Sequence, residues 1–156
     1  MISVDVPGRG TLQFKHIVLD YNGTMAKDGM LLPGVEESLN RLSESLEVHI
    51  LTADTFGKCR GECSGIKGTV QILSQSIGAG EKEAFVERLG AEHTVAVGNG
   101  ANDRLMLAKA ALGMVILGPE GTSVQALQSA DVAVKEINEG LEMLLQPKRL
   151  IATLRL

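Results

Sequence analysis

Three groups of polar residues each follow an apolar run, and their types are suited to phosphoryl chemistry. Residues 20–24 (DYNGT) follow HIVL, residues 52–54 (TAD) follow LEVHIL, and residues 98–103 (GNGAND) follow HTVAV. An aspartate in such a place is, taken alone, more often a helix cap or a turn residue. A functional site is indicated only if the elements of the fold bring the three groups together.

The side chains in these groups match the ligand preferences of Mg²⁺. Asp20 and Asp103, with Asn99 and Asn102, offer carboxylate and amide oxygens. Such oxygens suit Mg²⁺, a hard cation that keeps several of its waters. Thr52 adds a hydroxyl group, and the glycines among these residues allow the backbone to approach a ligand closely.

A phosphoryl group beside carboxylates also needs a positive charge. Lys82, at the start of the segment EKEAFVERL, is the best candidate, although by itself it would be interpreted as a solvated helix lysine. An aspartate, a hydroxyl, a lysine and Mg²⁺ together indicate phosphoryl transfer through an aspartyl-phosphate.

The elements that must position these residues alternate along the chain. After an N-terminal β-hairpin over residues 2–14, strands are predicted over residues 16–21, 46–53, 69–73, 93–100, 113–118 and 131–134. Helices are predicted over residues 35–45, 55–65, 81–90, 102–112, 122–130 and 137–146, the second of them weakly because of its glycines. We expect residues 1–156 to form a single α/β domain, a doubly wound, mainly parallel, Rossmann-like sheet with helices on both faces. Ligands of such sheets bind at the carboxyl ends of the strands, where the three polar groups are expected.

Composition argues against several classes of partner. The net charge is −4, aromatic residues make up 3% and Trp is absent, all of which disfavour a nucleic acid partner. No apolar run has the length of a membrane span, and the first residues lack a signal-peptide pattern, so we expect a cytoplasmic protein. Cys59 and Cys63, spaced i and i+4, could suit a metal or a redox pair, but two free thiols are the favoured interpretation.

The polar groups also resemble the motifs of a known superfamily. LDYNGT, LTADT, Lys82 and VGNGANDRLML resemble, in order and spacing, the four motifs of the haloacid dehalogenase-like (HAD) hydrolases, over about residues 16–135. LTADT is similar to the LTGDN-type stretch of P-type ATPases, and GNGANDRLML to their GDGVND-type stretch. The group of soluble P-type ATPase-like phosphatases fits best. The resemblance implies a phosphatase-type hydrolase that requires Mg²⁺.

Carried over position by position, the resemblance implies roles for individual residues. Asp20 would be the nucleophile. Thr52 and Lys82 would hold the phosphoryl oxygens, with Gly23 and Ala53 beside them in the substrate-binding surface.

The metal ligands that the resemblance implies come from the same edge of the sheet. Asp20 and the backbone carbonyl of Asn22 would bind Mg²⁺, and Asn99 and Asp103 would complete the site directly or through water. Asn102 would orient these ligands.

Two residues depart from the superfamily pattern. Asn22 stands where most of its phosphatases have an acid, and an amide cannot give or take a proton at ordinary pH. General acid–base help contributes ~10²–10⁴-fold, so we expect slow turnover or a long-lived phosphoenzyme. Asn99 replaces a usual aspartate, which should lower metal affinity. The alternatives are a degenerate phosphate- or partner-binding module and, less favoured, a receiver domain phosphorylated on aspartate.

The chain has no room for the cap domains of the superfamily between Asp20 and Thr52 or between Thr52 and Lys82. An uncovered site could accept a large phosphorylated substrate or gain cover from the hairpin of residues 2–14, from the loop of residues 25–34, or from a homo-oligomer. The capless octulosonate-phosphate phosphatases, for example, form tetramers. An edge extension of the sheet is an equally favoured interpretation of residues 2–14. The apolar tail, residues 147–156, is expected to pack back on its own domain.

Overall fold

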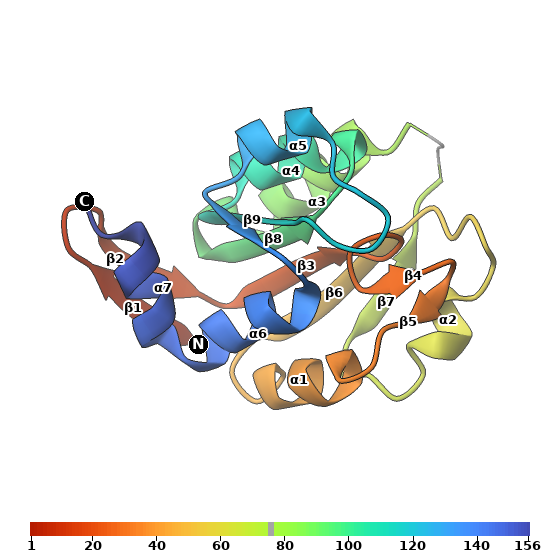
Figure 1. The fold of residues 1–156 in the computed structure, drawn as a ribbon, viewed down its shortest axis with the longest axis horizontal. Coiled ribbons are helices and arrows are strands. Elements are labelled where there is room, and N and C mark those ends of the chain that lie inside the picture. The colour runs from red at the N-terminus through yellow and green to blue at the C-terminus, as the bar shows by residue number, and fades with distance from the viewer. Residues whose placement is uncertain (75–76) are drawn as a thin grey trace.

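The computed structural model describes residues 1–74 and 77–156 and is built on a six-stranded parallel sheet (Figure 1). Its strands are β3 (His16–Asp20), β6 (Glu47–Thr52), β7 (Thr69–Ile72), β8 (Thr94–Gly98), β9 (Leu112–Ile116) and β10 (Val132–Val134). Their order across the sheet is β10-β9-β8-β3-β6-β7. This is the doubly wound 3-2-1-4-5-6 order, so the predicted fold class is confirmed. Receiver domains have the order 2-1-3-4-5, which excludes that alternative.

Helices cover both faces of the sheet. The helices are α1 (Val35–Leu42), α2 (Cys59–Glu62), α3 (Ala79–Leu89), α4 (Arg104–Lys109), α5 (Val124–Ser129), α6 (Ile137–Leu145) and α7 (Pro147–Leu154), with short 3-10 turns at η1 (Ala91–His93) and η2 (Ala101–Asp103). In Figure 1, α1 and α6 lie on one side of the sheet, and α3, α4 and α5 lie on the other. The helix predicted over residues 55–65 is reduced to the single turn α2, because glycine is a poor helix former.

The central strands are buried on both faces, which explains their continuous apolar runs. In β3, Ile17 and Leu19 join the apolar cluster that contains α1 and α6, whereas Val18 joins the cluster that contains α3, α4 and α5. This alternation follows from the two-residue period of a strand. None of the helices among the described residues is long and apolar enough to cross a membrane.

The predicted N-terminal hairpin is present but lies away from the carboxyl ends of the strands. β1 (Ile2–Val6) and β2 (Gly10–Phe14) form a separate antiparallel sheet, and β2 leads through one residue into the amino end of β3. Figure 1 accordingly shows the hairpin and both termini at the end of the sheet opposite to β4 and β5. The expectation that residues 2–14 cover the candidate site of their own chain is therefore wrong.

The apolar tail packs on its own chain, as predicted. Leu150 and Leu154 of α7 are buried in the same cluster as Val4 of β1. The backbone N–H of Leu156 donates to the carbonyl of Pro7 at 3.2 Å. The tail thus helps to hold the N-terminal hairpin against the sheet.

A second, smaller hairpin stands beside the carboxyl ends of the strands, where the sequence analysis expected only a loop. β4 (Ala26–Lys27) pairs with β5 (Met30–Leu31) within the segment 25–34. The buried Tyr21 hydroxyl donates to the Gly29 carbonyl at 2.8 Å, which ties this hairpin to the end of β3. Of the two segments expected to provide cover, this one is placed to do so.

Candidate active site

Asp20 ends β3 at the position where the strand order reverses. β3 lies between β6 and β8, and the strands that follow β6 and β8 along the chain extend to opposite edges of the sheet. In doubly wound sheets this switch point is the usual ligand site. The side chain of Asp20 is 11% exposed, so its carboxylate is accessible from one direction only.

Lys82 reaches Asp20 from the first turns of α3. Its Nζ lies 2.7 Å from Asp20 Oδ1 and 2.7 Å from Asp103 Oδ1. Its side chain is 1% exposed, so the interpretation as a solvated helix lysine is wrong. An ammonium group has three N–H donors, and two of them are used here.

Asp103 is fully buried and anchors the loop after β8. Its Oδ2 accepts hydrogen bonds from the backbone N–H groups of Asn99 at 3.0 Å and Gly100 at 2.9 Å. A Cβ atom on Gly98 would lie 2.5 Å from the Asp103 carboxyl carbon, so only glycine fits there. Protein donors therefore contact both oxygens of Asp103: two backbone N–H groups contact Oδ2, and Lys82 contacts Oδ1.

Thr24 connects the first and third polar groups, a role that the sequence analysis did not assign. Its hydroxyl lies 3.2 Å from Asp20 Oδ2 and 3.1 Å from Asn99 Oδ1. One hydroxyl hydrogen can serve only one of these acceptors at a time. Asp20 Oδ2, at the end of β3, and Asn99 Oδ1, just after β8, thus both lie next to the Thr24 hydroxyl. Each keeps a lone pair that this hydroxyl does not use. The place of Thr24 within DYNGT was the only sequence signal.

Gly23 allows this approach of the two loops. Its φ is 79°, in the left-handed region, and a Cβ atom there would collide with the Asn99 amide. The Asn99 Nδ2 donates to the Gly121 carbonyl at 3.0 Å, which directs its Oδ1 toward Thr24. The orientation of Asn99 is therefore set from both sides.

Asn22, two residues after Asp20, has oxygens that the turn around it does not use. Its half-buried side chain has an Oδ1 without a hydrogen-bond partner among the described residues. The turn hydrogen bonds around it use the carbonyls of Tyr21 and Ala26, leaving that of Asn22 free. Unpaired oxygens at the edge of a carboxylate site fit a hard cation, so the donor set is compatible with Mg²⁺.

Residues 52–54 form a tight turn at the end of β6. Thr52 is buried, and its Oγ1 accepts from the Asp54 backbone N–H at 2.9 Å. Asp54 has a φ of 53° and accepts at 3.0 Å from the Cys59 N–H, which fixes the start of α2. Thr52 follows Leu51, the register partner of Asp20, and Ala53 comes next. The second polar group therefore lies beside the first.

Two other groups singled out in the sequence lie outside this centre. Asn102 is exposed, on the solvent side of η2, and makes none of the hydrogen bonds that order the cluster. Cys59 and Cys63 are free and buried, with their Sγ atoms 3.9 Å apart. The hydrogen bond with Cys63, together with burial, raises the pKa of the Cys59 thiol, whereas the same hydrogen bond lowers the pKa of the Cys63 thiol.

The charges of the centre shift one another. Burial and the nearby Asp103 carboxylate raise the pKa of Asp20 to about 6, although Lys82 acts in the opposite sense. For Lys82, burial lowers the pKa, but the two carboxylates outweigh burial and hold it above its ordinary value. Lys82 is thus a permanent cation, and Asp20 is largely ionised at neutral pH.

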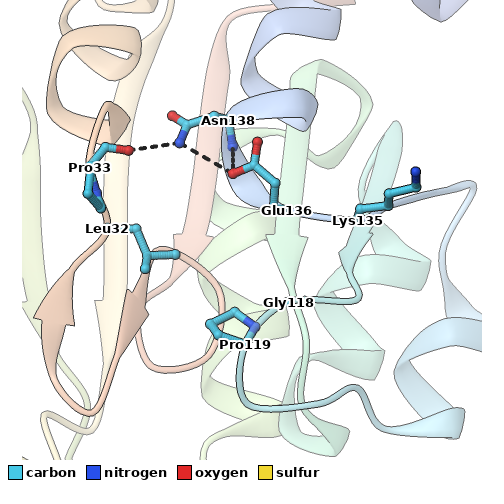
Figure 2. A pocket seen from close by; sticks show the side chains of 7 residues that line it. All are labelled: Leu32, Pro33, Gly118, Pro119, Lys135, Glu136 and Asn138. Carbon is cyan, nitrogen blue, oxygen red and sulfur yellow. Dashed lines mark hydrogen bonds between the residues drawn. The ribbon is translucent and has the colours of Figure 1, made fainter.

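A cavity of about 310 Å³ lies between the segment at Leu32 and Pro33, the loop at Gly118 and Pro119, and the start of α6 (Figure 2). A Cβ atom on Gly118 would lie 2.9 Å from the Gly23 carbonyl, so the rim of the cavity touches the candidate site. Asn138 donates to the Pro33 carbonyl at 2.9 Å and joins the two walls. The lining residues are Leu32, Pro33, Gly118, Pro119, Lys135, Glu136 and Asn138.

Sequence comparison identifies relatives of unknown function. No family model matches the chain. An uncharacterized protein of Methanocaldococcus jannaschii is 46% identical over 61 residues, which span 39% of this chain and 66% of that protein. A second uncharacterized protein of the same organism is 54% identical over 39 residues, 25% of this chain and 89% of that protein.

Solved structures with the same fold are phosphatases. The cobalt-bound deoxy-D-mannose-octulosonate 8-phosphate phosphatase of Haemophilus influenzae has a TM-score of 0.70 at 14% identity, covering 88% of this chain and 90% of that one. The corresponding enzyme of Moraxella catarrhalis, with magnesium, phosphate and the sugar acid, has a TM-score of 0.66 at 18% identity, covering 90% and 92%. A HAD-superfamily phosphatase of Bacteroides thetaiotaomicron has a TM-score of 0.65 at 10% identity, covering 95% and 98%. The chain therefore has the fold of the HAD phosphatases, as the sequence motifs predicted.

Proposed function

We propose that this chain, which belongs to the same family as the second Methanocaldococcus jannaschii protein and has the HAD phosphatase fold, is a Mg²⁺-dependent phosphohydrolase. The observation that carries the proposal is the contact of one buried lysine, Lys82, with the carboxylates of Asp20 and Asp103 at the switch point of the sheet. A buried cation beside an accessible carboxylate can receive a phosphoryl dianion without rearrangement.

In the first step, an oxygen of Asp20 attacks the phosphorus atom of a phosphoric ester. The new Asp20 O–P bond forms as the bond from phosphorus to the leaving oxygen breaks, and solvent supplies the proton to that oxygen. The third N–H of Lys82 and the Thr52 hydroxyl bind the phosphoryl oxygens. Water then attacks phosphorus, releases inorganic phosphate and restores the Asp20 carboxylate.

The residues that would hold Mg²⁺ follow from which oxygens are free. Asp20 Oδ2 and Asn99 Oδ1 both lie next to the Thr24 hydroxyl, and the Asn22 carbonyl, two residues after Asp20, would be the third ligand. Asp103 Oδ2 is used by two backbone N–H groups and Oδ1 is in contact with Lys82, so Asp103 would act mainly through water or by holding Lys82. The ion, when bound, offsets the negative charge of the phosphoryl group beside Asp20.

Asn22 sets the rate of the second step. Its amide can orient a water or the leaving oxygen by hydrogen bonding but cannot exchange a proton with either. The phosphorylated form of Asp20 is therefore expected to decay slowly, at a rate set by unassisted attack of water.

The rest of the substrate would lie in the cavity next to Gly23. The cavity has about 310 Å³, enough for the carbon skeleton of a small phosphomonoester. Its lining includes one cation, Lys135, and one carboxylate, Glu136, which is engaged by the backbone N–H groups of Asn138 and Glu139. The solved relatives act on a phosphorylated sugar acid. A small anionic phosphomonoester is thus the substrate class that we test first.

The deciding experiment is phosphoenzyme formation with Mg²⁺ and radiolabelled acetyl phosphate, comparing the native chain with Asp20→Asn. An acid-stable, hydroxylamine-labile label on the native chain, absent from a folded Asp20→Asn variant, is the expected result. Absence of the label from a native chain that still binds beryllofluoride with Mg²⁺ would overturn the proposal. The chain would then be a phosphate-binding module without turnover.

A further inference from the structure

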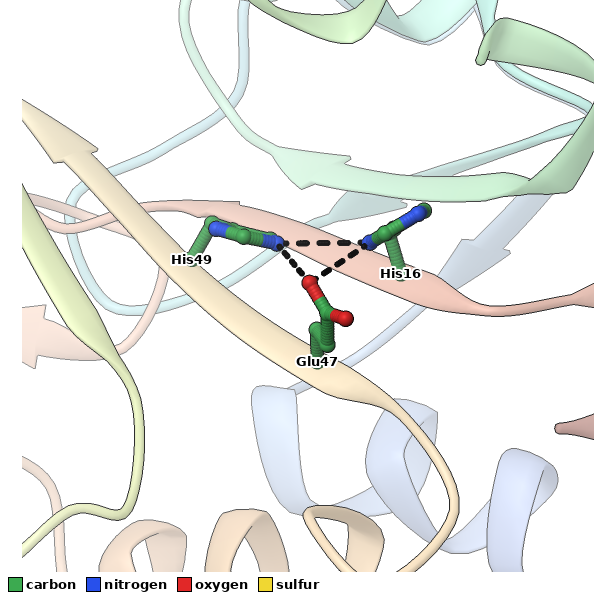
Figure 3. A group of neighbouring side chains, drawn as sticks. All are labelled: His16, Glu47 and His49. Atoms are coloured by element: carbon green, nitrogen blue, oxygen red, sulfur yellow. Dashed lines mark hydrogen bonds and ion pairs between the residues drawn. The ribbon is translucent and has the colours of Figure 1, made fainter. Parts of the chain in front are cut away.

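Three side chains that the proposed phosphatase chemistry does not use come together at the amino end of the sheet. His16 begins β3, and Glu47 and His49 belong to β6, the neighbouring strand (Figure 3). His16 and Glu47 are register partners, and His49 follows two residues later, so all three side chains project from the same face of the sheet. Asp20 lies four positions after His16 along β3, which corresponds to roughly 13 Å.

The ligand atoms of the three residues face one another. His16 Nδ1 lies 3.4 Å from His49 Nε2 and 3.4 Å from Glu47 Oε2, and His49 Nε2 lies 3.8 Å from the same carboxylate oxygen. A tetrahedral metal with bonds of 2.0–2.1 Å separates its ligand atoms by about 3.3–3.4 Å. The triangle in Figure 3 therefore already has nearly the size of one face of such a coordination sphere.

The far side of the His49 ring is held in place. Its Nδ1 lies 3.2 Å from the Thr69 hydroxyl of the adjacent strand β7, and the ring of Phe85 packs edge-on against it with centroids 5.5 Å apart. When Nδ1 donates to Thr69, Nε2 carries the lone pair that a metal requires. The imidazoles of His16 and His49 are only 14% and 11% exposed, so few rotamers are open to either of them.

Solvent reaches the group from the carboxylate side. The Glu47 side chain is 72% exposed and lines two surface cavities, one shared with His16 and the other with His49. A cation can therefore enter without any change in the fold. The open side of the group is therefore the side of Glu47.

We propose that His16, Glu47 and His49 form a binding site for one divalent transition-metal ion, with a water as the fourth ligand. Two imidazoles and one carboxylate suit Zn²⁺, Co²⁺ or Ni²⁺ and do not suit Mg²⁺, which prefers oxygen. The ion takes the place of the proton shared between the two imidazoles and links β3 to β6. This site is separate from the oxygen-rich centre at Asp20, and the proposal does not depend on phosphatase activity.

The test is a titration with Co²⁺ in the presence of excess Mg²⁺. It uses the full chain with Cys59→Ser and Cys63→Ser, called the parent chain below. These conditions remove thiolate ligands and keep the oxygen site occupied. We expect one equivalent of Co²⁺ to bind with the visible d–d absorption of a tetrahedral N₂O₂ site, and Zn²⁺ to displace this Co²⁺.

His16→Gln and His49→Gln should each abolish this absorption. The chain supplies a matched control, because His93 is its third histidine and lies outside the group. His93→Gln should leave the absorption unchanged.

Thr69→Val provides a second test, in which the affinity for Co²⁺ is measured. If Thr69 only packs against His49, this substitution should leave that affinity unchanged. Loss of a partner to a metal-bound imidazole typically weakens affinity 10–100-fold, and we expect that weakening with the spectrum retained. Circular dichroism and the melting temperature establish that each variant is folded. The proposal is overturned if folded His49→Gln binds Co²⁺ as the parent chain does, or if the parent shows no tetrahedral absorption with one equivalent at micromolar concentrations.

Discussion

The ammonium nitrogen of Lys82 lies 2.7 Å from a carboxylate oxygen of Asp103, and neither side chain is open to solvent. Burying such a pair is expensive, because two ions lose their hydration. The cost is offset only when further hydrogen bonds satisfy the charges, as the backbone N–H groups of Asn99 and Gly100 do for Asp103. The pair therefore makes the candidate site rigid before any ligand arrives.

Changing Lys82 to Met should lower the free energy of unfolding by about 3–5 kcal/mol, because two buried carboxylates lose their shared cation. Urea denaturation at pH 7 measures this. The matched control is Lys109→Met, whose partner Glu87 lies 2.6 Å away on the exposed surface. Lys109→Met should change stability little, because water screens that pair. Equal effects of the two substitutions would contradict the assignment of Lys82 as the buried counter-ion of the site.

Asn22→Asp should accelerate the decay of phosphorylated Asp20 by ~10²–10⁴-fold, since a carboxyl group can take a proton from the attacking water. The decay is followed by chasing labelled enzyme with unlabelled acetyl phosphate. Asn22→Ser, which adds no acid or base of suitable pKa, is the control and should not accelerate it. An unchanged decay in Asn22→Asp would show that the position is not within reach of the reacting water.

Gly23→Ala should abolish Mg²⁺-dependent phosphorylation, because the new methyl group displaces the Asn99 amide. The left-handed backbone adds a cost of about 1–2 kcal/mol. Gly10→Ala separates the two effects, since Gly10 has a φ of 86° and nothing within 4 Å of an added Cβ. Gly10→Ala should lose only the stability that the backbone costs and should keep its labelling, whereas Gly23→Ala should lose more stability in urea and lose its labelling. Normal labelling of Gly23→Ala would remove Asn99 from the metal site.

Lys135→Ala should raise the KM for anionic phosphomonoesters and leave kcat nearly unchanged, because Lys135 lines the cavity and makes no contact with Asp20. The measurement is steady-state kinetics with one anionic and one neutral leaving group. Lys148, exposed on α7 and distant from the cavity, provides the control substitution to Ala. If KM rises equally for neutral esters, or equally in Lys148→Ala, the cavity is not the leaving-group site.

The local patterns of the sequence were enough to predict the main elements of the fold. Apolar runs such as HIVL and HTVAV predicted strands buried on both faces, and strand–helix alternation predicted the doubly wound sheet, because these signals lie within a few residues of one another. The carboxyl-edge rule for parallel sheets then placed Asp20, Thr52 and Asn99 near one another. Residues 55–65, predicted weakly as a helix, form only the single turn α2, because their glycines disfavour a longer helix.

Only the tertiary structure decided which side chains are partners. The contact between Lys82 and Asp103 and the shared hydroxyl of Thr24 depend on how α3 and two loops pack over the ends of three strands. The same holds for His16 and His49, 33 residues apart in the chain, which meet because β3 and β6 pair in one particular register. The position of the N-terminal hairpin at the far end of the sheet follows from the direction in which β3 starts. Helices and strands depend on residues that are neighbours in the chain, so the sequence by itself determined them. Burial, charge pairing and register depend on segments far apart in the chain, which come into contact only when the core has packed.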